Sequence, residues 1–192
     1  FSHTAGTFGS RFTVNKSSGM VNLLTTLTMA STTPITVTQG TLNIGAQNWS
    51  NNSAVFSNNG TIQLNGSQTA AGITNLTNDI NSGTWLYVGD GDSAADTFTV
   101  KDFGGTDYYD LTINATDAAE ILNATASVVV ANTLTITSGH YSPGANSTAV
   151  NGLTTLIING GVYDQGAGAL NVAGDFLVQS GTFNGSSGII TV

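Results

Sequence analysis

Three aspartates stand close together in the segment GDGDSAAD at 89–96. The spacing of Asp90, Asp92 and Asp96 matches the start of a calcium-binding loop, in which neighbouring carboxylates supply the hard oxygen ligands that Ca²⁺ prefers. The segment lacks the central glycine and the twelfth-position glutamate of an EF-hand, and also the glycine-rich nonapeptide of calcium-binding β-rolls. Two interpretations stay open: a structural Ca²⁺ site, or an acidic loop exposed to solvent. No other cofactor is expected.

Catalysis is the weaker hypothesis for this acidic region. More carboxylates follow the loop, and we expect them to crowd around it: Asp102, Asp107, Asp110 and Asp117. Polysaccharide lyases and hydrolases on β-helices need clustered carboxylates together with a basic residue, but the chain has only three cations: Arg11, Lys16 and Lys101. Neither His3 nor His140 has an obvious Asp or Ser partner, and His140 is expected on the surface. The sequence therefore predicts a protein that is not an enzyme.

The elements that position these residues follow from an eight-residue phrase that occurs three times. It reads LTITSGHY at 134–141, LIINGGVY at 156–163 and FLVQSGTF at 176–183. Alternation of apolar residues indicates a strand, and glycine at a fixed offset indicates a corner. A unit of about twenty residues cannot bury its own apolar face, so copies must stack on one another. We expect a β-solenoid in which Tyr141, Tyr163 and Phe183 form one internal aromatic column.

A longer repeat of about 99 residues accompanies the short one. Corner glycines recur with the same order of spacings in both halves: Gly6, Gly40, Gly60, Gly83, Gly105, Gly139, Gly161 and Gly181. We therefore expect two solenoid modules, 1–99 and 100–192, in one continuous rod of about 8–9 coils, with Leu42, Ile62 and Trp85 in the first-half column that corresponds to the aromatic one. The 34-residue gaps need an extra strand or a protruding loop. The alternative is two β-sandwich domains of about 100 residues each.

Composition fits an all-β chain and limits its partners. Hydrophobic residues make up 40% of the chain, charged residues only 7%, and the net charge is −8. This surface cannot make the many Lys/Arg–phosphate contacts of nucleic-acid binding, and no apolar run is long enough for membrane insertion. Surface glycans are a partner to consider, because Asn-x-Ser/Thr sequons are frequent: Asn15, Asn48, Asn51, Asn59, Asn65, Asn75, Asn114, Asn123, Asn146 and Asn184.

The residue pattern of these repeats resembles that of a known group of secreted proteins. Segments such as ITVTQGTLNIG at 35–45, YYDLTIN at 108–114 and LNVAGDFLVQSGTFN at 170–184 are similar to the β-solenoid repeats of large bacterial surface proteins, in the broad sense of filamentous-haemagglutinin-like adhesins and autotransporter passengers. The resemblance implies a right-handed parallel β-helix outside the cell, used as a stalk, adhesin or fibre. It implies no ligand.

These observations lead to one functional hypothesis and two alternatives. Neither end carries a polar capping coil, so we expect the edge strands to pair with other chains. Two explanations fit: the segment is a piece of a longer tandem array, or it is a subunit that stacks end to end. We expect a non-enzymatic structural module of a fibre or giant adhesin at the cell surface. The first alternative is a carbohydrate-binding or polysaccharide-cleaving β-helix with a groove lined by Trp49, Trp85 or Tyr108 and Tyr109. The second is a pilus-like sandwich subunit that polymerises by strand donation.

Overall fold

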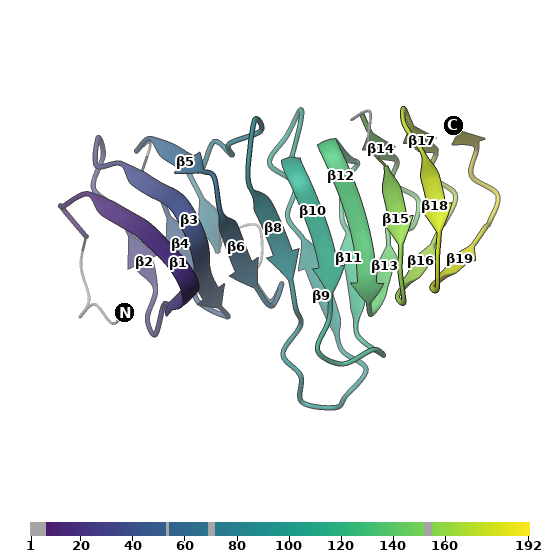
Figure 1. Cartoon of the computed structure of the whole chain (residues 1–192), viewed down its shortest axis with the longest axis horizontal. Helices are drawn as coiled ribbons and strands as arrows, with labels where there is room; N and C mark the ends of the chain where they lie inside the picture. Colours follow the sequence, from purple (N-terminus) through teal and green to yellow (C-terminus); the bar gives the residue numbers. More distant parts are fainter. Residues whose placement is uncertain (1–6, 53, 69–71, 152–154) are drawn as a thin grey trace.

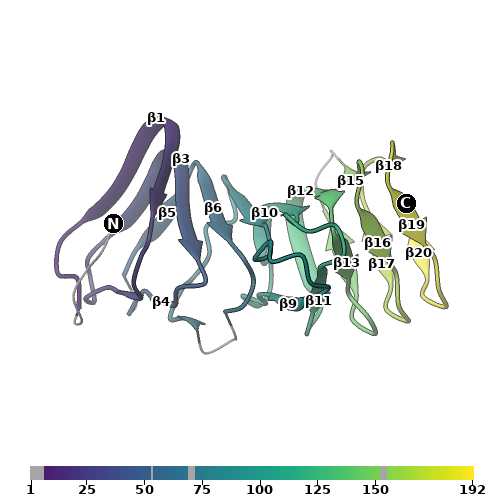
Figure 2. The same ribbon diagram turned by 90° about the horizontal axis from the view of Figure 1, so that it is seen from below.

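The chain folds into a parallel β-solenoid. The computed structural model describes residues 7–52, 54–68, 72–151 and 155–192. Every strand pair among these residues is parallel. The coils follow one another along a single axis from the N-terminal to the C-terminal end (Figures 1 and 2). The all-β solenoid is thus confirmed, and the two-sandwich alternative is wrong, because sandwiches are built from antiparallel sheets.

Three sheets form the walls of the coil. The largest has twelve strands: β1 (Phe12–Asn22), β3 (Ile35–Gly45), β5 (Phe56–Asn58), β6 (Thr61–Leu64), β8 (Thr84–Tyr87), β10 (Tyr108–Asn114), β12 (Val128–Ser138), β14 (Thr148–Val150), β15 (Leu156–Ile158), β17 (Leu170–Val172), β18 (Phe176–Val178) and β20 (Ile190–Thr191). The second has five: β9 (Thr97–Val100), β11 (Ile121–Ala124), β13 (His140–Ser142), β16 (Val162–Asp164) and β19 (Thr182–Asn184). The third has three: β2 (Leu27–Thr28), β4 (Trp49–Ser50) and β7 (Ile73–Thr74). The described residues contain no helix, and hence no helix that could cross a membrane.

One internal column runs through the whole stack. Direct strand pairing connects eight inward-facing residues, one per coil: Val21, Leu42, Ile62, Trp85, Leu111, Leu134, Leu156 and Phe176. Consecutive members are 20 to 26 residues apart in the sequence. At the parallel-strand spacing of about 4.8 Å, eight coils give a rod on the order of 40 Å long. Because the largest sheet continues from β8 into β10, residues 1–99 and 100–192 share one sheet.

The second predicted column is also present. Tyr141 pairs with Tyr163, and Tyr163 pairs with Phe183. Their ring centroids are 5.3 and 5.5 Å apart, within the range in which aromatic rings attract one another. The column extends back through Leu122 to Phe98 in β9. The repeated phrase therefore places its aromatic residues inside the coil, as predicted.

The correspondence between the two halves differs from the prediction. A shift of 99 residues would place Leu42 level with Tyr141, but Leu42 lies in the column of Leu134 in the largest sheet. Gly40, Gly60 and Gly83 lie at a corner within the largest sheet, whereas Gly139, Gly161 and Gly181 precede the five-stranded sheet. The cause is common to both corners. A Cβ on Gly60 would collide with the carbonyl oxygen of Gly40, and one on Gly181 with that of Gly161. Close backbone approach between coils selects glycine at either corner.

Candidate functional site

The three aspartates of the predicted calcium loop come together in the structure. The connection between β8 and β9 carries them and protrudes beyond the neighbouring coils (Figure 1). Asp90, Asp92 and Asp96 are exposed, and one carboxylate oxygen from each lies within 4.8 Å of the others. Two of these side chains also cap their own loop, because Asp90 accepts a hydrogen bond from the Asp92 amide (3.4 Å) and Asp92 from the Ala94 amide (2.8 Å). The loop thus presents three hard oxygen ligands on one side.

A buried carboxylate from the next coil holds this loop. Glu120 is fully buried, and its Oε1 accepts hydrogen bonds from the amides of Asp90 (2.8 Å) and Gly91 (3.1 Å). Its Oε2 accepts a longer bond from the Asp117 amide (3.4 Å). A buried charge needs such donors, since an unpaired carboxylate in the interior is costly. Sequence analysis did not identify Glu120, because the two loop residues that it binds, Asp90 and Gly91, lie about thirty residues away and no local pattern connects them with it.

Of the acidic residues expected around the loop, Asp117 lies beside it, because its amide binds the same Glu120 carboxylate, whereas Asp107 and Asp110 bind residues of the following coil. Asp107 is buried, and its two oxygens accept hydrogen bonds from the amides of Phe103 (2.8 Å), Gly104 (3.1 Å) and Val129 (2.7 Å). Burial raises the pKa of the Asp107 carboxyl above its ordinary value, although these bonds act in the opposite direction. Asp110 lies on β10 and accepts hydrogen bonds from Asn132 and the Thr133 amide. These carboxylates connect one coil to the next.

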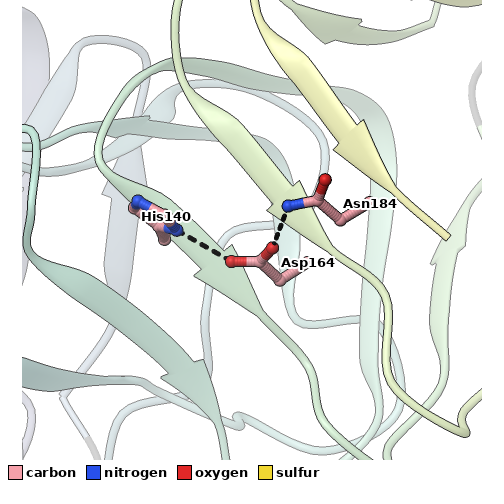
Figure 3. A network of polar contacts seen from close by, with 3 residues as sticks. All are labelled: His140, Asp164 and Asn184. Atoms are coloured by element: carbon pink, nitrogen blue, oxygen red, sulfur yellow. Dashed lines mark hydrogen bonds and ion pairs between the residues drawn. The ribbon is translucent and has the colours of Figure 1, made fainter. Parts of the chain in front are cut away.

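His140 has an acidic partner that sequence analysis did not find. Its Nδ1 lies 2.8 Å from Oδ2 of Asp164, one coil further along the five-stranded sheet (Figure 3). The second oxygen of Asp164 accepts a hydrogen bond from the Asn184 amide group (2.6 Å), so three successive coils are joined. Both side chains of the His–Asp pair are one-third exposed. In the described part of the chain no hydroxyl is hydrogen-bonded to His140, so this geometry is that of a lateral bridge between coils. His3 lies outside the described residues.

The aromatic residues expected to line a sugar-binding groove are mostly in the core. Trp49, Trp85 and Tyr108 are each at most 1% exposed. The indole nitrogen of Trp85 donates to Asn78 (2.9 Å), and its ring contacts that of Tyr108 with centroids 6.0 Å apart. Tyr109 alone is partly exposed. The two tryptophans and Tyr108 are therefore too deeply buried to line the groove that the carbohydrate alternative requires.

The outer surface of the described residues includes two hollows beside strands of the largest sheet. The larger, about 530 Å³, lies beside β5 and is lined by residues of segments 54–57 and 77–81, where Asp79 accepts a hydrogen bond from the Asn58 amide (2.9 Å). The smaller, about 240 Å³, lies across β8, β10 and β12 and is lined by Thr84, Asp110, Thr112, Asn132, Thr133 and Thr135. Neither hollow includes a histidine, lysine or arginine.

Comparisons with protein-family models, with curated proteins and with solved structures find no match for this chain. The resemblance to surface adhesins stays a prediction, and the function is inferred from the geometry alone.

Proposed function

We propose that this solenoid is a non-enzymatic structural module of an extracellular surface fibre or giant adhesin, and that it associates end to end. The observation that carries the proposal is the unbroken eight-member column of β-paired residues, which has edge strands at both ends. Such a stack is stiff, and it can be lengthened by any chain that adds a further coil in register. The residue pattern of the repeats and the low content of charged residues (7%) support a place among secreted surface proteins.

The distribution of exposed apolar side chains supports association at the ends. Seven of the nine exposed large apolar residues among those described lie in the first or last coil: Met20, Leu24, Leu177, Val178, Ile189, Ile190 and Val192. The last coil carries five of them. Exposed edge strands with apolar side chains are the surfaces on which other strands pair. About half of the exposed residues described in the coils between the ends are Thr, Asn or Ser.

Light scattering combined with negative-stain electron microscopy of the purified chain tests this proposal. We expect rods longer than the roughly 40 Å of eight coils, in numbers that rise with protein concentration. Val178→Asp, at the last coil, should abolish the long rods because a buried carboxylate in the new contact would lack a partner. Val55→Asp is the matched control, since Val55 is also an exposed valine (67% against 50% for Val178) but lies away from the ends. Single rods at every concentration would contradict the proposal.

We further propose a structural Ca²⁺ in the loop of Asp90, Asp92 and Asp96, because their carboxylates converge within 4.8 Å. Isothermal titration with CaCl₂ should give a one-to-one binding heat, and chelation should lower the melting temperature. The triple Asp→Asn variant should show neither effect. An absence of binding heat and an unchanged melting temperature in the unaltered chain would refute the ion.

A further inference from the structure

The smaller hollow on the outer surface is formed by side chains from three neighbouring coils. On β10, Asp110 pairs with Thr84 of β8 and with Thr133 of β12. Two residues further along, Thr112 pairs with Thr135 of β12. Leu111, which alternates with Asp110 and Thr112, is buried, so these side chains point away from the core. All the lining residues are polar and partly buried: Thr84, Asp110, Thr112, Asn132, Thr133 and Thr135.

An irregularity in the strand register accompanies the hollow and fixes its carboxylate. From Tyr108 to Asp110 strand β10 advances by two residues, whereas β12 advances by three, from Val130 to Thr133. β12 thus has one residue more than its partner at this point, as in a β-bulge. The side-chain amide of Asn132 and the backbone amide of Thr133 both donate to Oδ1 of Asp110, at 2.8 and 3.1 Å. Two donors on one oxygen hold the carboxylate in a single orientation.

The other half of this carboxylate and three hydroxyl groups are unused. Oδ2 of Asp110 has no hydrogen-bond partner among the described residues, and the hydroxyls of Thr84, Thr112 and Thr135 have none there either. A carboxylate oxygen can only accept, whereas a hydroxyl can both donate and accept. The hollow, at about 240 Å³, is smaller than the pockets of roughly 300–1,000 Å³ that take drug-sized ligands. It therefore suits a single small ring that carries several hydroxyl groups.

Three other classes of ligand fit this hollow poorly. An anion would be repelled by the Asp110 carboxylate, and the lining contains no lysine, arginine or histidine to offset the repulsion. Ca²⁺ takes about 6–8 oxygen ligands, often from several carboxylates, and Asp110 is the single carboxylate among the lining residues. An apolar ligand would remove water from the carboxylate without replacing its hydrogen bonds. These arguments favour a polar ligand without negative charge.

We propose that this hollow binds one uncharged sugar ring, with Oδ2 of Asp110 accepting a hydrogen bond from one ring hydroxyl and the threonine hydroxyls binding its neighbours. The proposal goes beyond the proposed function, because it does not require end-to-end association. Binding to a single hollow is weak, since few contacts offset the cost of immobilising the sugar. A fibre of many modules would repeat the hollow along its side, and avidity would strengthen attachment to a surface that carries many copies of the sugar.

Titration of the isotope-labelled chain with three sugars, followed by amide NMR spectra, tests this proposal. The probes are the methyl glycosides of glucose, galactose and mannose. At least one should shift the amide signals of Asp110 and Thr133 in a saturable way, and added NaCl should not change its affinity because the sugar is uncharged. Asp110→Asn should weaken binding about tenfold, because the hydrogen bond to a charged acceptor is lost. Thr112→Val, which keeps the shape of the side chain, should weaken it about threefold.

Thr41→Val is the matched control. Thr41 is also partly buried and lies on the same sheet in the row that leads through Thr61 to Thr84, two coils before the hollow. Its replacement should leave the affinity unchanged, and circular dichroism establishes that each variant is folded.

Three results would overturn the proposal. The first is the absence of saturable shifts at Asp110 and Thr133 with all three glycosides. The second is equal affinity in the unaltered chain, Asp110→Asn and Thr112→Val, which would place the sugar elsewhere. The third is saturable binding of methylammonium chloride that NaCl abolishes, with no binding of the sugars, which would make the hollow a site for cations. None of these results depends on the length of the rods, so the proposed function stands or fails separately.

Discussion

Replacing Glu120 by alanine should destabilise the loop that holds the three exposed aspartates. The Glu120 carboxylate is fully buried and accepts hydrogen bonds from the amides of Asp90, Gly91 and Asp117. Alanine removes the acceptor and leaves a void beneath the loop. The donors cannot follow, because β8 and β9 fix the two ends of the segment.

The magnitude follows from the geometry of these bonds. Hydrogen bonds to a charged group each contribute about 1.5–3 kcal/mol, and two of the three are well formed, at 2.8 and 3.1 Å. Water can reach part of this exposed loop and replace some of the lost bonding. We therefore expect Glu120→Ala to lower the free energy of unfolding by about 3 kcal/mol. Glu120→Gln keeps one acceptor oxygen, so its cost should be about 1–1.5 kcal/mol.

Urea denaturation monitored by circular dichroism measures the loss, and amide hydrogen exchange locates it. The amides of Asp90 and Gly91 should lose protection in Glu120→Ala more than those of the five-stranded sheet. In calcium-free buffer with chelator, Asp92→Ala is the matched control, because Asp92 is an exposed carboxylate with one amide bond in the same loop, and its loss should cost about 0.5 kcal/mol. A cost below about 1 kcal/mol for Glu120→Ala, with unchanged protection of the two amides, would refute the assignment of Glu120 as the anchor of the loop.

Three further changes probe contacts between coils. Tyr141→Phe should cost about 1 kcal/mol in urea denaturation, because it removes a buried hydrogen bond to Thr148 (3.2 Å). Tyr163→Phe should cost less, because the buried Tyr163 hydroxyl makes no well-formed hydrogen bond to a described residue. Burial raises the pKa of the Asp110 carboxyl, so ionisation of this group opposes folding. Its contribution to the free energy of unfolding should be largest below the ordinary aspartate pKa of about 4 and should be lost as the pH rises through the folded-state pKa. Asp110→Asn should therefore reduce the fall in stability in denaturation curves measured from pH 4 to 7. His140→Ala removes a partly exposed bridge to Asp164, and a loss of more than about 1 kcal/mol would show that the bridge is stronger than ordinary surface pairs.

The sequence pattern predicted the solenoid because its short repeat reflects a requirement that every coil must meet. Alternating apolar residues identified the columns of Leu42 and Tyr141, and strand pairing confirms both. The correspondence between the two halves of about 99 residues could not be obtained in the same way. Glycine marks any corner at which two coil backbones approach closely, and the coil has two such corners, so the same phrase is used at different places in the two halves.

The polar contacts between coils were harder to predict than the columns. His140 and Asp164 are 24 residues apart and meet diagonally across two strands, so they could have been paired only after the register of β13 and β16 was known. Glu120 gave no signal at all, because a buried glutamate in a turn looks like any surface acid in the sequence. Asp90, Asp92 and Asp96 were identified because their proximity is local.

The pairing of each coil with only its two neighbours determines how the rod would respond to tension. A pull on the two ends is resisted at any moment by the outermost coil alone, so the chain should unravel one coil at a time rather than in a single rupture. Each coil holds 20 to 26 residues between successive members of the central column, and every step should release about 70–90 Å of extended polypeptide. A fibre of such modules would act as an extensible tether that dissipates mechanical work in small increments.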